Sequence, residues 1–228
     1  MTSDPTFVST VLAAGQPGDR PPAPAGLALV QAFLNTTDRE DRIDQLRDLA
    51  GLQSWLLSNA LPGADLPLRE GDRRRLVAFR EGVRALVMGR DHGGIDPAAL
   101  TVVNDAAREA KLTVAFDRHG EPALEPVVRG LDALVARLVA DITAASMDGT
   151  WVRLKVCPRT ACGWAFYDAS KNRSGRWCAM AVCGNRTKSA RSRARRGAAS
   201  SLALGVGMDP VVVTADRPLT SQRRHRVR

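Results

Sequence analysis

The sequence has no long apolar stretch. Nowhere in its 228 residues is there a run near the roughly 20 apolar residues that a membrane-spanning helix needs, so we expect no membrane partner. The short apolar run at residues 8–14 follows the acidic Asp4 and has no Lys or Arg before it, which is unlike a secretory signal. We therefore expect a cytoplasmic protein.

Common catalytic motifs are also missing. Neither G-x-x-x-x-G-K-[ST] nor H-E-x-x-H occurs, so nucleotide hydrolysis and zincin-type proteolysis have no support. His119 and Glu121 form the H-x-E of a zinc nucleobase deaminase, whose second motif is P-C-x-x-C. That second motif fails, because Pro158 follows Cys157 and the next cysteine is Cys162. We expect no enzymatic activity.

Net positive charge is confined to the C-terminal third of the chain. The formal charge is +9, yet residues 1–150 carry 16 Lys and Arg against 21 Asp and Glu. Residues 151–196 carry 12 basic residues and a single acidic one, Asp168, and residues 197–228 carry five basic and two acidic residues. This segregation is typical of a polyanion-binding module joined to an acidic body, although a solvated basic face without a partner would look the same.

The N-terminal two thirds predict a mainly α fold. Apolar residues recur at helical spacing in a first group and again between residues 68 and 89. The first group is Ile43, Leu46, Leu49, Leu52, Trp55 and Leu56, and the second is Leu76, Phe79, Val83, Leu86 and Val87. Asp96 and Pro97 have the residue types of an N-cap and first helical position for a helix over 98–110.

One small β-hairpin should interrupt these helices. Residues 112–116 favour a strand, which a turn at residues 118–120 would return toward residues 122–124. The longest helix is predicted from about residue 125 to residue 146.

All four cysteines lie within residues 157–183. The pattern is Cys157-x4-Cys162, fifteen residues, then Cys178-x4-Cys183. Two pairs of thiolates on two loops, joined by a segment long enough for a hairpin, suit one tetrahedral Zn²⁺. Four reduced cysteines packed as small apolar residues are the alternative, but in a reducing cytoplasm the clustering favours a metal.

Two stretches resemble known families. Residues 151–196 resemble the CGNR zinc finger, whose naming motif stands here as Cys183, Gly184, Asn185 and Arg186. Upstream, GLALVQAFLNT at residues 26–36 resembles the opening of the ABATE domain, which precedes this finger in proteins described as stress-induced transcription regulators. The resemblance implies transcription regulation in a stress response.

A basic helix should follow the last cysteine, with Asn185 as its cap. It has no apolar stripe, so a polyanion explains its charges better than packing within the protein does. A second basic patch lies in the loop between the cysteine pairs. The candidate DNA-binding residues are Lys171, Arg173, Arg176, Asn185, Arg186, Lys188, Arg191, Arg193, Arg195 and Arg196.

Double-stranded DNA is the favoured partner, with phosphate contacts giving affinity and one or two arginines reading guanine edges. RNA is an alternative, but aromatic residues are too few for a base-stacking platform. A zinc-stapled module that docks an acidic protein is another.

The resulting architecture has four parts. Residues 1–25 are predicted as a flexible segment, 26–148 as a helical ABATE-like domain, 149–200 as the zinc finger with its hairpin and basic helix, and 201–228 as a basic, flexible tail. The helical domain would sense a small molecule or protein, or form a homodimer, which the sequence permits without demanding. Asn35 and Thr36 are its candidate ligand-binding residues, and helix capping is their alternative role.

Overall fold

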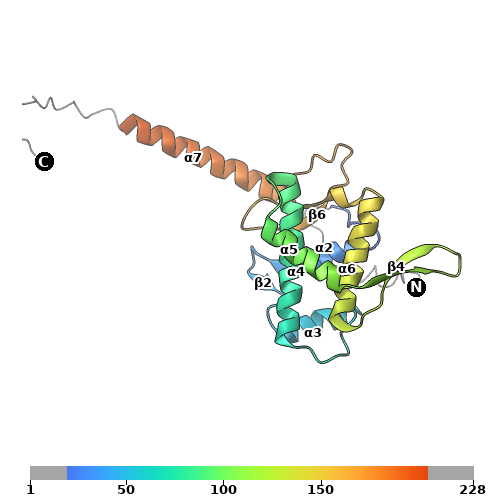
Figure 1. Ribbon diagram of the computed structural model, residues 1–228. Helices are drawn as coiled ribbons and strands as arrows, with labels where there is room; N and C mark the ends of the chain where they lie inside the picture. Colours follow the sequence, from blue (N-terminus) through green and yellow to red (C-terminus); the bar gives the residue numbers. More distant parts are fainter. Residues whose placement is uncertain (1–19, 205–228) are drawn as a thin grey trace, which may run out of the picture. The chain divides into compact units, whose positions relative to one another are not determined.

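The computed structural model describes residues 20–204, which form helices with three separate two-stranded sheets (Figure 1). The predicted mainly α fold is confirmed. In chain order the elements before the finger are α2 (Leu27–Leu34), β1 (Thr37–Asp38), β2 (Ile43–Asp44), α3 (Leu49–Ser58), α4 (Glu70–His92), α5 (Pro97–Glu109), β3 (Leu112–Phe116), β4 (Pro122–Pro126) and α6 (Gly130–Met147).

The finger region continues the chain without a break. A 3₁₀ turn η2 (Trp151–Arg153) leads into the hairpin of β5 (Leu154–Val156) and β6 (Ala165–Tyr167), and a π-helical turn η3 (Met180–Gly184) precedes the long helix α7 (Asn185–Leu204). The chain divides into two compact units, residues 1–187 and 188–228, and the division falls inside α7. Residues 1–19 and 205–228, which include most of the predicted lead-in and tail, lie outside the described range.

One hydrophobic core joins the helices to the first hairpin of the finger. Its fully buried members come from α2, α3, α4, α6, β5 and β6, and include Phe33, Leu52, Phe79, Leu134, Leu138, Leu154 and Ala165. A second, smaller cluster surrounds the cysteines. The hairpin beyond the predicted boundary at residue 148 therefore shares the core of the helical region.

Several predicted elements are present. The apolar stripe of α4 is buried at Leu76, Phe79, Val83 and Val87. Asp96 caps α5 by accepting a hydrogen bond from the Ala98 N–H at 2.9 Å. Strands β3 and β4 form the predicted hairpin, which extends away from the helices (Figure 1) and leaves Phe116 exposed.

The predicted helix through Ile43 and Leu46 is wrong. Ile43 lies in β2, and the helix begins only at Leu49, where Asp48 accepts a hydrogen bond from the Gly51 N–H at 2.7 Å. The side chain of Asp44 breaks the helical pattern, because it accepts the Leu46 N–H and pairs with Arg80 on α4 at 2.7 Å. Spacing alone could not reveal this long-range pair.

Two other boundaries differ from prediction. Helix α6 starts at Gly130 and not near residue 125, because β4 takes the chain as far as Pro126 to pair with Leu112. Part of residues 20–25, which fall in the segment predicted to be flexible, is anchored to the fold: Ala23 is buried, and its N–H donates to the Gln31 side chain at 2.9 Å. Among residues 20–204, no helix is both long and apolar enough to cross a bilayer.

Candidate metal centre and nucleic-acid interface

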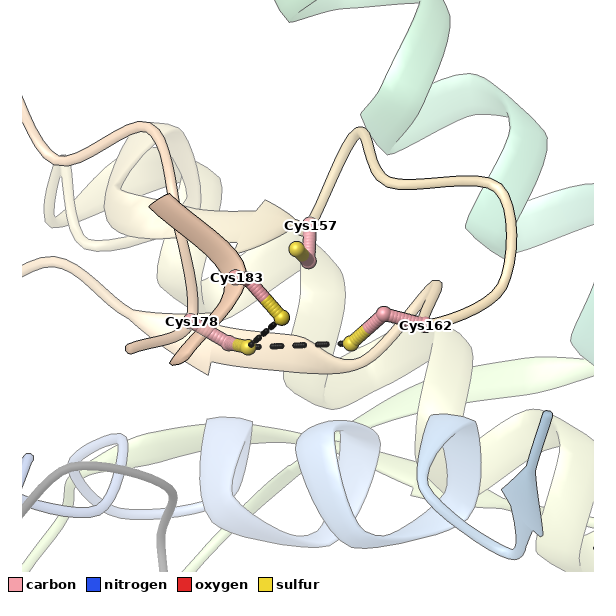
Figure 2. A group of neighbouring side chains, drawn as sticks. All are labelled: Cys157, Cys162, Cys178 and Cys183. Atoms are coloured by element: carbon pink, nitrogen blue, oxygen red, sulfur yellow. Dashed lines mark hydrogen bonds between the residues drawn. The ribbon is translucent and has the colours of Figure 1, made fainter. Parts of the chain in front are cut away.

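The four cysteines converge from two loops. Cys157 directly follows β5, and the turn after it is closed by a bond of 2.7 Å from the Cys162 N–H to the Arg159 carbonyl. Cys178 and Cys183 flank a second turn, in which the Cys183 N–H donates to the Ala179 carbonyl at 2.9 Å. All four side chains are buried, and their sulfur atoms point toward one another (Figure 2).

The sulfur positions fit a tetrahedral metal. All four Sγ atoms lie within 4.8 Å of one another, with 3.5 Å between Cys178 and Cys183 and 3.6 Å between Cys162 and Cys178 (Figure 2). A tetrahedron built from Zn–S bonds of about 2.3 Å has edges of about 3.8 Å. Relatively small adjustments of the side chains would therefore close the site around one ion.

The protonation chemistry of the cluster also calls for a cation. The neighbouring thiols of Cys162 and Cys178 lower the pKa of Cys157 to about 2. Cys157 in turn raises the pKa of Cys162 to about 12, and it also raises the pKa of Cys178. Thiols this close cannot all ionise together unless a positive ion lies between them. The cluster is the site of one structural zinc, and four thiolates leave no open position for a reacting water.

Two arginines outside the predicted set support the cluster. The Arg159 Nε–H donates to the Cys183 sulfur at 3.3 Å, a contact of the kind that orients a metal ligand. Arg20 donates to the carbonyls of Trp177 and Cys178 at 2.9 and 2.7 Å, and its guanidinium lies 4.6 Å from the centre of the Phe166 ring. The position of Arg159 between the first two cysteines could have indicated its role, but nothing in the sequence around Arg20 does.

Asp168 shapes the loop between the cysteine pairs. Its buried carboxylate accepts hydrogen bonds from Lys155 Nζ at 2.9 Å, the Gly175 N–H at 2.7 Å and the Ser170 N–H at 3.1 Å. Burial alone would raise the pKa of Asp168, but the bonds from Lys155, Ser170 and Gly175 outweigh it and lower the pKa to about 2. The loop that Asp168 holds presents three exposed basic residues of the predicted set, Lys171, Arg173 and Arg176.

Most of the other predicted DNA-binding residues are exposed on α7. These are Asn185, Arg186, Lys188, Arg193, Arg195 and Arg196; the side chain of Arg191 lies outside what the structure describes. Arg186 is engaged within the protein, since its guanidinium pairs with Glu40 from the β1–β2 turn. The predicted cap is wrong: Asn185 has helical backbone angles, and its amide donates to the Ala181 carbonyl at 3.1 Å, because η3 already provides the turn that precedes α7.

Asn35 and Thr36 make their contacts inside the fold. The Asn35 amide accepts from the Ala165 N–H at 2.8 Å and donates to the Ala165 carbonyl at 2.9 Å. The buried Thr36 hydroxyl donates to the Phe33 carbonyl at 2.8 Å and accepts from Arg80 at 2.9 Å. Both are thus committed to structural bonds, and a ligand-binding role for either stays a prediction.

The H-x-E fragment plays no part in the metal centre. His119 and Glu121 lie exposed in the turn between β3 and β4, and within the described residues the candidate metal-binding group consists of the four cysteines.

Comparison with known families agrees with this geometry. Residues 153–196 match the model of the CGNR zinc finger, and residues 27–147 match that of ABATE, described as "Putative stress-induced transcription regulator". No curated protein matches the chain. The predicted resemblance and the predicted zinc site are confirmed. Since the ABATE match alone covers more than half of the sequence, the chain belongs to the ABATE family and carries a CGNR zinc finger.

Proposed function

We propose that the protein is a zinc-dependent regulator of transcription that binds double-stranded DNA. The observation that carries this proposal is the run of exposed basic residues in the finger, which no acidic residue interrupts in the sequence. No acidic residue lies between Asp168 and Asp209. In the loop between the two cysteine pairs and on α7, every basic residue whose side chain the structure describes is exposed. An exposed helix of this charge gains nothing from packing in its own fold, whereas a duplex would neutralise it.

The loop between the cysteine pairs and helix α7 would contact different parts of the DNA. Lys171, Arg173 and Arg176, held in place by Asp168 and by the zinc ligands, supply contacts to the phosphate backbone. Residues of α7 lie along one helix, the element that fits the major groove, so one or two of its arginines would reach guanine edges. The zinc has a structural role in this proposal, and the protein has no enzymatic activity.

We place the protein in the cytoplasm, where its helical region would bind an effector that regulates DNA binding. A cavity of about 240 Å³ lies between α4, α5 and α6, with an apolar wall that includes Phe79, Ala106 and Val135. Its opening carries Arg75, which is paired with Asp72 at 3.0 Å. A small effector seated there would contact α4, the helix that also carries the buried Arg84 to the finger. A homodimer would double the contact with DNA, and its interface stays undefined in this proposal.

The test is fluorescence anisotropy of a labelled duplex titrated with the full chain, with zinc and with chelator, at several salt concentrations. The full chain is required because β5 and β6 share the core of the helical region. We expect binding that depends on zinc. A plot of the logarithm of the association constant against the logarithm of the salt concentration should fall with a slope of about 0.9 for each phosphate contact. Binding that is weak and indifferent to zinc would refute the proposal.

Two competitors separate the alternatives. Single-stranded or duplex RNA that displaces DNA at equal concentration would favour RNA, and polyglutamate that does so would favour an acidic protein partner. Effector sensing is tested by a thermal-shift screen of small molecules against the wild type and against Ala106→Leu, which fills the cavity. A compound that raises the melting temperature of the wild type alone would support sensing at this site.

A further inference from the structure

One carboxylate links the helical region to the start of the basic helix. Glu40 lies in the turn between β1 and β2, where the Asp38 carboxylate accepts the N–H groups of Glu40 and Asp41 at 2.9 and 3.1 Å. Its two carboxylate oxygens contact different guanidinium groups, Oε2 that of Arg159 and Oε1 that of Arg186. Glu40 thus sits between two cations that come from opposite ends of the zinc-binding segment.

Both arginines are positioned by the metal centre. Arg159 lies in the turn between the first two cysteines and is tethered through its Nε–H to the Cys183 sulfur at 3.3 Å. Arg186 follows Cys183 by three residues, at the first turn of α7. Zinc binding would therefore hold the Arg159 side chain and the backbone of Arg186 near each other.

The one carboxylate of Glu40 is shared by two guanidinium groups, and Arg159 is also balanced by the Cys183 sulfur of the metal centre, so the cation left without a full counter-charge is Arg186. Arg186 keeps 55% of its side-chain surface exposed and Glu40 keeps 37%, so the group is open to solvent on this side. A phosphodiester carries one negative charge on two terminal oxygens. It therefore has the same charge as the carboxylate of Glu40 and accepts hydrogen bonds from a guanidinium group in a similar way.

We propose that Arg159 and Arg186 form a site for one phosphate of the DNA backbone, and that Glu40 is an internal competitor that fills this site when DNA is absent. The proposal rests on the DNA-binding function argued above and adds Arg159 to its contacts. The backbone of Glu40 is held by Asp38. The Glu40 carboxylate can therefore leave the two guanidinium groups by rotation of its side chain alone. The pair of Glu40 with Arg186 is exposed and therefore weak, whereas the side chain of Arg159 is only 18% exposed, so a dense array of phosphates would replace the carboxylate first at Arg186.

The experiment measures duplex binding by anisotropy with zinc-loaded full chain at low and moderate salt. Glu40→Gln removes the competitor but keeps the shape of the side chain, and should bind DNA about three- to ten-fold more tightly at low salt, as expected for the release of two partly exposed ion pairs. The control is Glu121→Gln, an exposed carboxylate in the β3–β4 turn with the same change of charge. It should stay within about two-fold of the wild type.

The arginine side of the site is tested by Arg186→Gln, with Arg74→Gln on the exposed face of α4 as its control. Arg186→Gln should weaken binding and lower the salt slope by about one, the contribution of one phosphate contact. Combined with Glu40→Gln, it should shrink the gain in affinity, because one of the two cations is gone. A gain that persists in full would mean that Glu40 acts only through overall charge, and would overturn the proposal.

The outcomes separate this proposal from the function on which it rests. If the wild type binds DNA in a zinc-dependent manner and Glu40→Gln binds equally well or less well, Glu40 is a positioning residue, and only this inference fails. If no variant binds DNA, both fail. Inorganic phosphate at matched ionic strength is the last arm: if it stabilises the wild type but not Arg186→Gln against heat, the site takes free phosphate, which would also overturn the proposal. Zinc content measured for each variant shows that the finger has folded.

Discussion

We predict that Asn35 stabilises the contact between the helical region and the zinc finger. Its side chain bonds to both the N–H and the carbonyl of Ala165 in β6, at 2.8 and 2.9 Å, and so takes the place of a neighbouring strand along the open side of the hairpin. Asn35→Ala removes both bonds at once. Gln31 still donates to the Ala165 carbonyl at 3.2 Å, but the amide oxygen that accepts the Ala165 N–H is lost.

The expected cost is about 1 to 3 kcal/mol in the free energy of unfolding. A net hydrogen bond in a folded protein contributes about 1 kcal/mol, and leaving a buried donor without a partner costs about 1 to 3 kcal/mol. Ala165 is fully buried, so water does not readily replace the lost acceptor. The lower end of the range applies if a water molecule enters beside the half-buried Asn35 position.

Urea unfolding of the zinc-loaded protein, followed by circular dichroism, measures this cost. The matched control is Asn104→Ala on the exposed face of α5, where we expect a change within about 0.5 kcal/mol. If Asn35→Ala is as stable as that control, the amide does not join the two regions. In that case the hypothesis of a ligand-binding role for Asn35 would regain its force.

Three further predictions concern the metal, the loop and the core. Chelation of the zinc should lower the melting temperature and change tryptophan fluorescence, because Trp164 and Trp177 pack against the cysteine cluster; a melting curve unaffected by chelator would count against a structural metal. Asp168→Asn should lose about 1 to 3 kcal/mol at neutral pH. Burial would raise the pKa of Asp168, but its bonds from Lys155, Ser170 and Gly175 together outweigh burial and lower the pKa from 3.8 to about 2. The carboxylate therefore stabilises the fold above about pH 4, and its contribution disappears as the pH falls toward 2. The difference in stability between wild type and Asp168→Asn should therefore close over that interval in urea titrations, and a constant difference would refute the assignment. Leu134→Ala should cost about 2 to 5 kcal/mol by calorimetry, since Leu134 is fully buried where α6 meets the core, and a loss below 1 kcal/mol would mean that the core relaxes around it.

Local chemistry made the metal site and several helices predictable from sequence. Four thiols within one short segment have few other uses, and the spacing of Leu76, Phe79 and Val83 matches the apolar face that α4 buries. The Asp96–Pro97 pair marks a helix start through bonds made within three residues. In each case, the determining interaction lies close in the chain.

The Asn185 cap failed for a local reason, the preceding turn η3, but two other features that the sequence did not reveal depended on partners distant in sequence. Ile43 and Leu46 follow a helical spacing, but the pairing of Asp44 with Arg80, 36 residues away, fixes an extended turn there. The docking of Arg20 near Cys178 spans 158 residues and uses backbone carbonyls as acceptors. A carbonyl is present at every position, so no residue type in the sequence identifies where such an arginine will bind.

The same long-range contacts decide how the finger can respond to the rest of the protein. Arg84 on α4 is buried, and its guanidinium donates to the Leu34 carbonyl at the end of α2 and to the Gly163 carbonyl beside Cys162. Arg90, nearer the C-terminal end of α4, donates to the carbonyls of Trp151 and Leu154 at 3.1 and 2.6 Å. A buried guanidinium bonded to two carbonyls tolerates little displacement, because moving either carbonyl breaks a buried hydrogen bond that the remaining ion pair with Glu81, at 3.2 Å, does not replace. Residues of α4 between Asp72 and Phe79 also line the cavity next to α5. If the proposed effector shifted α4 on binding there, the turn that carries Cys162 would be strained, and the effector would thereby act on the zinc ligands.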